Sequence, residues 1–300
     1  KQLKGIPHFS IAGLFDSDPI RTLEMSKRYN VESFSSVRDL LQKAEAISIV
    51  TPTSYHYEIG NLALDADCHL FIEKPITNNI EHAGLLLNKA EKLNKIIQVG
   101  HIERFNPAFT VLKNLHIQPL FIEAHRLAEF NPRGNDVPVI LDLMIHDLDI
   151  ILSLVDSEIK DIRANGVKVV SSSVDIANAR IEFENGCIAN IVASRASQNQ
   201  IRTLSVTQKD SFVVLDYTDQ EIYVHRKSSS EHKLSKDSLR YKQESLVERI
   251  FVHKDNPLKL ELKHFLDCVT NGSPRKVAID NELYSLEVAL NILSQFKSNL

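Results

Sequence analysis

The sequence predicts an α/β protein with two domains: a doubly wound parallel sheet, then an α+β domain on a large, open and mainly antiparallel sheet. Apolar strand-like segments alternate with helix-like segments over residues 1–106, as in doubly wound sheets. Over residues 107–300, strand-like segments follow one another with little helix between them, as in antiparallel sheets. A chain of 300 residues also favours two domains over one.

The elements of the first domain follow in regular alternation. An apolar strand ends in Asp16, and Pro19 closes the turn after it. A capping serine introduces the second helix, and the next strand stops at Pro52, because proline cannot donate to a strand ladder. The predicted elements are a strand over 8–16, a helix over 20–29, a helix within 33–45, a strand over 46–51, a helix over 56–67, a strand over 68–75, a helix over 78–95 and a strand over 96–101.

The second domain begins at residue 107 and is rich in β-branched and alternating segments. A Glu-Asn-Gly turn signal at 184–186 separates two of its strands. A pair of helices closes the chain, and the serine- and lysine-rich stretch 228–238 is expected to be a mobile loop. The predicted strands fall within 121–130, 162–173, 177–197, 202–218 and 221–227, and the helices within 258–272 and 281–296.

The composition is that of an ordinary globular protein, with 43% hydrophobic and 25% charged residues. The formal net charge of −4 gives no overall basic bias, so we expect neither nucleic acid nor an anionic membrane as a main partner. No uninterrupted apolar run is long enough to span a bilayer, and the first residues contain no signal-peptide core.

The three cysteines, Cys68, Cys187 and Cys268, lie far apart and show no Cys-x-x-Cys spacing. An odd number of separated cysteines argues against a disulfide framework and against a zinc site. We therefore expect free thiols, a cytoplasmic protein and no bound metal.

The segment 137–156 is apolar like a core helix and yet carries several ionisable groups. Asp142, His146 and Asp149 stand at positions i, i+4 and i+7, which form one stripe of a helix. We call these three residues the polar seam. Asp147 falls off the seam and is expected to meet solvent or another chain. The seam fits either a histidine satisfied within the core or a cleft in which a carboxylate tunes a histidine.

Polar residues also follow the strands of the first domain. In doubly wound sheets, ligands lie at the carboxyl ends of the strands. The residues expected at this edge are Asp16, Thr51, Glu73, Lys74 and His101.

Asp16 is the main indication of a cofactor. An acid at the end of such a strand accepts hydrogen bonds from an adenosine ribose and repels a 2′-phosphate, which favours NAD over NADP. The glycine-rich fingerprint that should precede it is absent, and residues 1–8 look like the tail of a helix. We therefore expect the chain as given to begin after its first strand and phosphate loop.

Several motifs together resemble the Gfo/Idh/MocA family, which contains glucose–fructose oxidoreductases and inositol dehydrogenases. They occur in the family's order across both domains, and the segment 261–274 also fits. The motifs are Thr51-Pro52 with His56, Glu73-Lys74-Pro75, Gly100-His101 with Arg104-Phe105-Asn106-Pro107, and Asp142-x-x-x-His146.

The resemblance implies a nicotinamide-dependent oxidoreductase that acts on a ring hydroxyl or carbonyl of a sugar, a cyclitol or a related compound. It implies that His146 is the general acid/base, that Lys74 orients the substrate and shares in proton transfer, and that Asp142 supports the histidine or binds substrate. The cofactor-binding residues it implies are Asp16, Thr51, Pro52, His56, Glu73 and Lys74. The substrate-binding residues it implies are His101, Arg104, Arg133 and Asp142.

The segment 137–150 lacks the glycines that many members of the family carry around the acid–histidine motif. In this it resembles the branch that contains UDP-N-acetylglucosamine 3-dehydrogenases, which implies a 3-keto nucleotide sugar as the product. Arg126, Arg133 and Arg195 are then candidates for a diphosphate, although arginines in loops usually meet only water or carboxylates.

Two other functions remain open at this point. One is an inositol or simple-sugar dehydrogenase on the same fold, and the other is a non-catalytic regulatory protein that senses sugars. The intact set of Lys74, Asp142 and His146 argues against the sensor, because a sensor needs no proton relay. We also expect a homodimer or homotetramer that forms through the second domain's sheet, because an open sheet has a face and edges that need covering.

Overall fold

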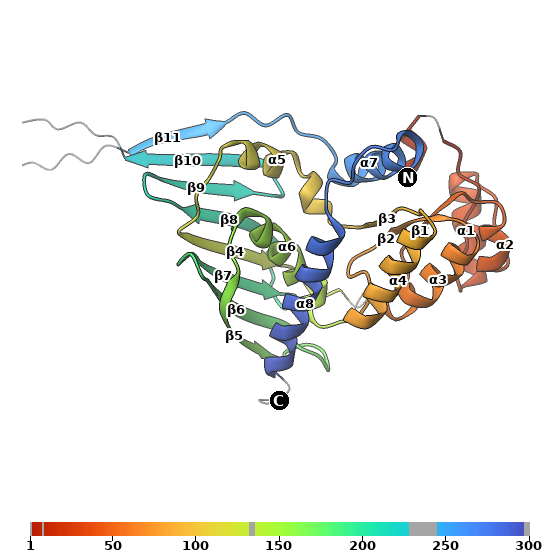
Figure 1. Cartoon of the computed structure of the whole chain (residues 1–300), viewed down its shortest axis with the longest axis horizontal. Coiled ribbons are helices and arrows are strands. Elements are labelled where there is room, and N and C mark those ends of the chain that lie inside the picture. The colour runs from red at the N-terminus through yellow and green to blue at the C-terminus, as the bar shows by residue number, and fades with distance from the viewer. Residues whose placement is uncertain (1, 8, 132–135, 228–244, 297–300) are drawn as a thin grey trace, which may run out of the picture.

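The computed structural model describes residues 2–7, 9–131, 136–227 and 245–296, and these residues form two sheets with helices around them (Figure 1). The first sheet has three parallel strands in the order β1-β2-β3. The second has eight strands in the order β11-β10-β9-β8-β4-β7-β6-β5. Both predicted sheet types are confirmed. The stretch 228–238 lies outside the described residues.

The first sheet arises from the predicted alternation of strands and helices. Three of its helices begin at side-chain caps: Asp18 accepts hydrogen bonds at the start of α1, Ser36 at α2 and Asn79 at α4. The elements are α1 (Pro19–Tyr29), α2 (Val37–Leu41), β1 (Ala46–Ile49), α3 (His56–Asp65), β2 (His69–Ile72), α4 (Ile80–Lys92) and β3 (Ile97–Val99).

The predicted strand over residues 8–16 is wrong. Of its described residues, only Leu14 forms a bridge, to Ser33. Leu14 N–H donates to the carbonyl of Glu32, and Phe34 N–H donates to the carbonyl of Leu14. A single bridge does not hold a ladder, so an apolar sequence is insufficient here without neighbouring strands. Near the start of the chain, residues Leu3–Gly5 form only a short 3-10 helix.

The second domain contains two elements that the sequence did not reveal. These are α5, which follows Pro107 directly, and the edge strand β11. β4 lies at the centre of the sheet, parallel to β7 and antiparallel to β8. The elements are α5 (Pro107–Asn114), β4 (Phe121–Leu127), β5 (Ile159–Val167), β6 (Ile176–Phe183), β7 (Ile188–Ser194), β8 (Ile201–Thr207), β9 (Ser211–Asp216), β10 (Glu221–Lys227) and β11 (Ser245–Ile250).

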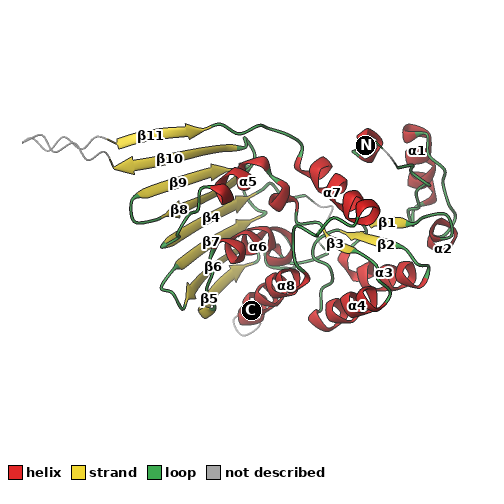
Figure 2. Cartoon of the chain, turned by 45° about the horizontal axis from the view of Figure 1, so that its top comes forward, coloured by secondary structure: helices red, strands yellow, loops and turns green. Residues whose placement is uncertain are grey.

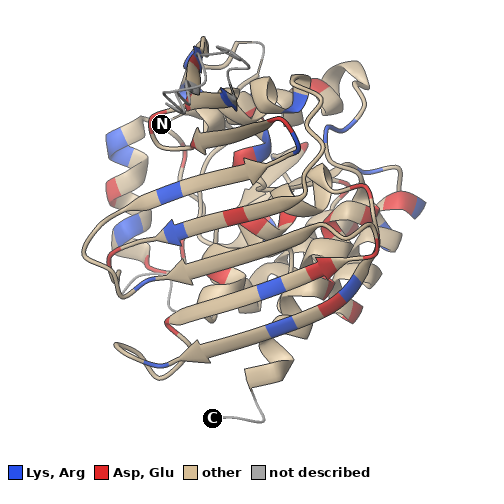
Figure 3. Cartoon of the chain, turned by 90° about the vertical axis from the view of Figure 1, so that its left-hand side faces the viewer, with Lys and Arg blue, Asp and Glu red and all other residues tan. Residues whose placement is uncertain are grey.

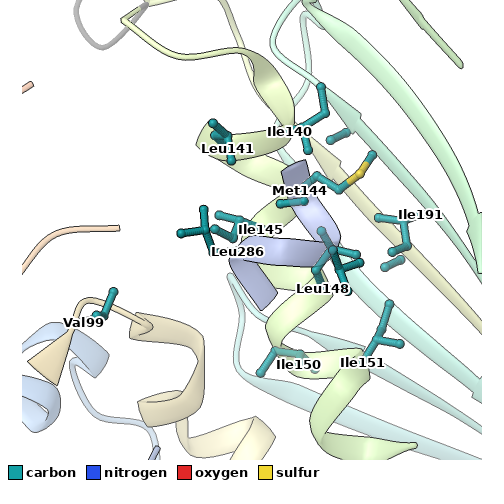
Figure 4. Close-up of a cluster of buried hydrophobic side chains, with 14 of the residues drawn as sticks. Val99, Ile140, Leu141, Met144, Ile145, Leu148, Ile150, Ile151, Ile191 and Leu286 are labelled. Carbon is teal, nitrogen blue, oxygen red and sulfur yellow. The ribbon is translucent and has the colours of Figure 1, made fainter. Parts of the chain in front are cut away.

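The segment that carries the polar seam starts with a π-helical turn, Ile140–Met144, and continues as α6, Ile145–Leu154. Helices α5, α6 and α8 lie on one face of the larger sheet, which we call the covered face (Figure 2). Met144 and Leu148 pack there with Ile191 of β7 and Leu286 of α8 (Figure 4).

No helix of the described residues covers the other face of the larger sheet (Figure 3). Burial alternates along the strands, as in β4, where Ile122 and Ala124 are buried whereas Glu123 and His125 are exposed. We call this exposed side the open face. Positively and negatively charged residues are scattered along its strands (Figure 3).

The two C-terminal helices link the sheets: α7 spans Pro257–Asn271 and α8 spans Ile279–Phe296. α7 packs on the first sheet, where the rings of Phe265 and Phe71 meet with centroids 5.8 Å apart. Arg275 donates to the carbonyl of Ile97, and Glu282 accepts a hydrogen bond from Val99 N–H. The side chains of Arg275 and Glu282 thus bind backbone groups on the outer edge of β3, an edge that pairs with no strand of the described residues.

All three cysteines are buried and free. Among the helices within the described residues, none has the length and apolar character needed to cross a membrane.

Candidate active site

Lys74 and the polar seam meet where the two sheets face each other. Lys74 follows β2, and its Nζ lies 3.0 Å from Asp142 Oδ1. The same ammonium donates to the carbonyl oxygen of Asp142. The side chains remain 17% and 30% exposed, respectively. Neither side chain of the pair is therefore sealed from solvent.

His146 lies one helical turn after Asp142 and is half-buried. Its Nδ1 is buried, and it has no hydrogen-bond partner among the described residues. Burial, and then the positive charges of Lys74 and Arg126, lower the pKa of His146 well below its ordinary value. The imidazole is therefore neutral near pH 7 and able to accept a proton.

Asp149 continues the seam into the interior and holds Arg104. Arg104 Nε lies 2.6 Å from Asp149 Oδ2, and its Nη2 lies 2.9 Å from Oδ1. His101 Nδ1 lies 3.7 Å from Asp149 Oδ2, which is too long for a hydrogen bond. Burial lowers the pKa of His101, and the charge of Asp149 opposes this shift. The seam thus combines a site-facing end, Asp142 and His146, with a buried ion pair.

The prediction that Asp147 meets solvent or another chain is wrong. It is fully buried, and its carboxylate accepts from Arg126 Nε at 2.8 Å and Nη2 at 2.9 Å. Arg126 Nη1 also donates to Glu103 Oε1 at 2.9 Å. Burial lowers the pKa of Arg126, but the carboxylates of Asp147 and Glu103 outweigh it and raise that pKa. Helical periodicity could not reveal a partner on β4.

His56 ties together the two loops at the carboxyl edge of the first sheet. Its Nδ1 lies 2.9 Å from the carbonyl of Pro75, and its Nε2 lies 2.9 Å from the carbonyl of Thr51. The ring is 1% exposed. His56 therefore contacts both loops and fixes the position of the turn that carries Lys74.

Glu73 does not lie on a surface turn. It is half-buried by exposed area, and burial raises the pKa of its carboxyl group while the charge of Lys74 opposes the shift. A Cβ added to Gly100 would lie 2.9 Å from Glu73 Oε2. Glycine at position 100 thus leaves room for Glu73 between the ends of β2 and β3.

The same edge offers surface suited to a nicotinamide dinucleotide. Thr51 and Pro52 are exposed, and the neighbouring Val50 and Tyr55 are 70% and 53% exposed. These exposed side chains offer apolar surface that suits a flat ring. The side chain of Asp16 is 34% exposed, lies 3.5 Å from Arg21 Nε and so keeps acceptor capacity for ribose hydroxyls.

The arginines proposed for a diphosphate are differently placed. Arg126 is bound to carboxylates, as described above. Arg195 Nε lies 2.9 Å from Asp175 Oδ1, and its Nη1 donates to the carbonyl of Val137. Arg133 lies outside the described residues. Both described arginines are thus engaged in buried contacts.

Two family models match the chain. One is described as an oxidoreductase family with an NAD-binding Rossmann fold and matches residues 2–101. The other is the GFO/IDH/MocA C-terminal domain and matches residues 123–213.

The relatives of this chain include dehydrogenases. The chain is 37% identical over 220 residues to a UDP-N-acetylglucosamine 3-dehydrogenase from Acidithiobacillus ferrooxidans, covering 73% of this chain and 70% of that protein. It is 25% identical over 274 residues to scyllo-inositol 2-dehydrogenase (NAD(+)) from Bacillus subtilis, covering 85% of this chain and 76% of that protein.

Solved structures share the arrangement of both sheets. The UDP-N-acetylglucosamine 3-dehydrogenase GnnA from Acidithiobacillus ferrooxidans superposes with a TM-score of 0.84 at 32% identity, covering 94% of this chain and 88% of that chain. A levoglucosan dehydrogenase superposes with a TM-score of 0.80 at 16% identity, covering 97% of this chain and 89% of that chain. The second likeness concerns the fold alone.

Proposed function

Because the chain belongs to the Gfo/Idh/MocA family of oxidoreductases, we propose that it oxidises a ring hydroxyl of a nucleotide sugar, the 3-hydroxyl of UDP-N-acetylglucosamine. The observation that carries this proposal is the contact of Lys74 with Asp142, one turn before the neutral His146. It brings a cation, a carboxylate and a base to one point between the two sheets.

These groups fit the oxidation of a carbinol. The nicotinamide cofactor supplies the hydride acceptor when it is bound. The hydroxyl proton must leave as the carbon loses hydride, and in this proposal His146 accepts it. The neutral imidazole becomes an imidazolium, the hydroxyl becomes a carbonyl, and the reverse transfers reduce the ketone.

Lys74 stabilises the charge that develops on the reacting oxygen. An ammonium that donates to this oxygen favours the alkoxide-like transition state over the neutral alcohol. Asp142 accepts from the same ammonium at 3.0 Å and so holds it in place. Asp142 thus orients Lys74 in this scheme and has acceptor capacity left for a substrate hydroxyl.

The choice of nucleotide sugar rests on the relatives. The 37% identical protein and the structure with a TM-score of 0.84 both carry that activity in their names. For the cofactor we propose NAD over NADP, because Asp16 has acceptor capacity for ribose hydroxyls and would repel a 2′-phosphate. Three free, buried thiols support a reducing compartment such as the cytoplasm.

The test is to incubate the full-length protein with NAD or NADP and a panel of substrates, following the absorbance of the reduced cofactor. The panel contains UDP-N-acetylglucosamine, other UDP-sugars, scyllo-inositol and myo-inositol. We expect turnover with UDP-N-acetylglucosamine and NAD. Turnover confined to the cyclitols would reassign the substrate, and binding without any turnover would favour the sugar sensor.

A further inference from the structure

Arg202 lies at the start of β8, on the covered face of the larger sheet. The β4–β8 register places it directly opposite Arg126. Side chains of directly paired residues project to the same face, and Arg126 faces α6. The buried Leu204 and Val206, two and four residues further along β8, share this orientation. Arg202 therefore projects toward the helices.

The guanidinium of Arg202 makes no hydrogen bond and no ion pair within the described residues, although the residue is half-buried. Three other arginines of the interior differ. Arg104, Arg126 and Arg195 each donate to a carboxylate at 2.6 to 2.9 Å. A half-buried cation without a partner is costly unless something else supplies one.

Arg202 lies beside the candidate active site. Its register neighbour Arg126 is bonded to Asp147, which follows His146 directly in the chain. The positive charge of Arg202 also helps to lower the pKa of His146, after burial and the larger effects of Lys74, Arg126 and His101. An anion held by Arg202 would therefore lie close to the reacting groups.

One competing role has to be weighed. Arg126 carries one positive charge against the carboxylates of Asp147 and Glu103, and Arg202 offsets the excess at a distance. A counter-charge of this kind normally forms hydrogen bonds, because a guanidinium presents a fork that matches carboxylates. Arg202 forms none with either acid, so its donors remain available.

We propose that Arg202 binds a phosphate group of the substrate and thereby selects nucleotide sugars over neutral sugars and cyclitols. This inference rests on the proposed function, since it assigns the phosphate-binding residue of the same site. The planar guanidinium of Arg202 suits bidentate contact with phosphate oxygens. Either the diphosphate of a nucleotide sugar or the single phosphate of a sugar phosphate provides this chemistry.

The experiment compares Arg202→Gln and Arg202→Lys with the matched control Arg163→Gln. Arg163 lies on β5 of the same sheet, and its side chain is 82% exposed. KM and kcat are measured for UDP-N-acetylglucosamine, N-acetylglucosamine 1-phosphate and scyllo-inositol. Calorimetry with UDP alone gives a measure that does not depend on turnover.

We expect Arg202→Gln to raise KM for the UDP-sugar by about tenfold to a hundredfold, as for a lost charge-assisted hydrogen bond. In Arg202→Gln we expect kcat, and KM for scyllo-inositol, to change by less than about threefold. In the control Arg163→Gln we expect KM for the UDP-sugar to change by no more than that. KM of Arg202→Lys for the UDP-sugar should lie between those of the parent and Arg202→Gln, since lysine keeps the charge but lacks the two-pronged guanidinium. An effect on the UDP-sugar but not on the monophosphate would assign Arg202 to the diphosphate.

Weaker UDP binding in Arg202→Gln would support the inference even if no UDP-sugar were oxidised, in which case only the proposed function fails. Equal UDP binding in the parent and in Arg202→Gln would overturn the inference. A lowered melting temperature with unchanged KM in Arg202→Lys or Arg202→Gln would likewise overturn it, and leave Arg202 as the counter-charge of Asp147 and Glu103.

Discussion

The ammonium of Lys74 lies 3.0 Å from Asp142 Oδ1, although 68 residues separate them in the chain. Lys74 lies two residues after strand β2 of the parallel sheet, and Asp142 lies in the π-helical turn Ile140–Met144. The proposed reacting groups therefore come from both halves of the molecule. Their spacing depends on how the two sheets are held.

Lys74→Met should lower turnover strongly, because the cation at the reacting oxygen is lost while the side chain keeps its length. A decrease of about a hundredfold or more in kcat is expected for such a loss. Asp142→Asn should lower kcat less, because the ammonium stays and loses only its carboxylate partner. Steady-state kinetics of both variants provides the measurement, and a larger loss in Asp142→Asn would mean that Asp142 also grips a substrate hydroxyl.

His146→Asn should lower turnover by roughly a hundredfold to ten-thousandfold, the range for a lost general acid–base. Cofactor binding and melting temperature should change little, because His146 Nδ1 makes no hydrogen bond to a described residue. The parent enzyme should lose oxidation activity only well below pH 6.5, where His146 becomes protonated. A His146→Asn variant with a lower melting temperature but ordinary turnover would show that His146 has a structural role and not a catalytic one.

Glu282→Gln should change how stability depends on pH. Burial raises the pKa of Glu282 to about 8 from its ordinary 4.5. Between these values the folded protein keeps a proton that the unfolded chain has lost, so the free energy of unfolding falls as pH rises through the window. Melting temperatures at about pH 5 and about pH 8 should therefore differ less in Glu282→Gln than in the parent.

The control for this experiment is Glu287→Gln, an exposed residue of the same helix, which should leave the pH dependence unchanged. In a large domain each kcal/mol corresponds to about 2–4 °C of melting temperature. A parent and a Glu282→Gln variant with parallel curves would show that Glu282 is ionised in the folded protein.

Asp16→Ala should weaken NAD binding more than it changes the maximal rate. We expect KM for NAD to rise by about tenfold, equivalent to ~1.4 kcal/mol, and kcat to stay within about twofold. Use of NADP should improve, because the repulsion of a 2′-phosphate is removed while Arg21 remains nearby. Glu24→Ala on the exposed side of α1 is the control. Equal or better turnover of NADP by the parent enzyme would refute the NAD preference.

We expect the open face of the larger sheet to be buried against another copy of the chain in a homodimer or homotetramer. Val192 lies on this face in β7, beside His125 and Asn178, so Val192→Glu should shift the population toward smaller species. Light scattering at micromolar concentration measures the mass of both proteins. A monomeric parent would rule out this assembly.

The sequence predicted the fold where periodicity and turn signals sufficed, as in α3, β2, α4 and α8. It failed where structure depends on distant partners. The segment that ends in Asp16 has strand-like composition but forms one bridge, since composition cannot say whether a neighbouring strand is present. β11 was missed because its residues carry no clear alternation.

The candidate site shows the same division. Helical spacing put Asp142 and His146 on one stripe, and in the structure Asp142 contacts Lys74 while the charge of Lys74 acts on His146. The same spacing assigned Asp147 to solvent, yet its partner Arg126 lies on β4. The alternation that places Leu204 and Val206 inward could have predicted that Arg202 also points inward. That it has no partner among the described residues could be seen only in the structure.

The passage between the two sheets at residues 101–107 is attached to the second domain by three side chains. Glu103 and Arg104 are bonded to side chains of the second domain, and Asn106 donates to the carbonyl of Tyr217. Torsion about this passage would break all three attachments together. The segment 101–107 should therefore keep the first sheet aligned with the second, and Arg275, between α7 and α8, adds a further attachment through the carbonyl of Ile97.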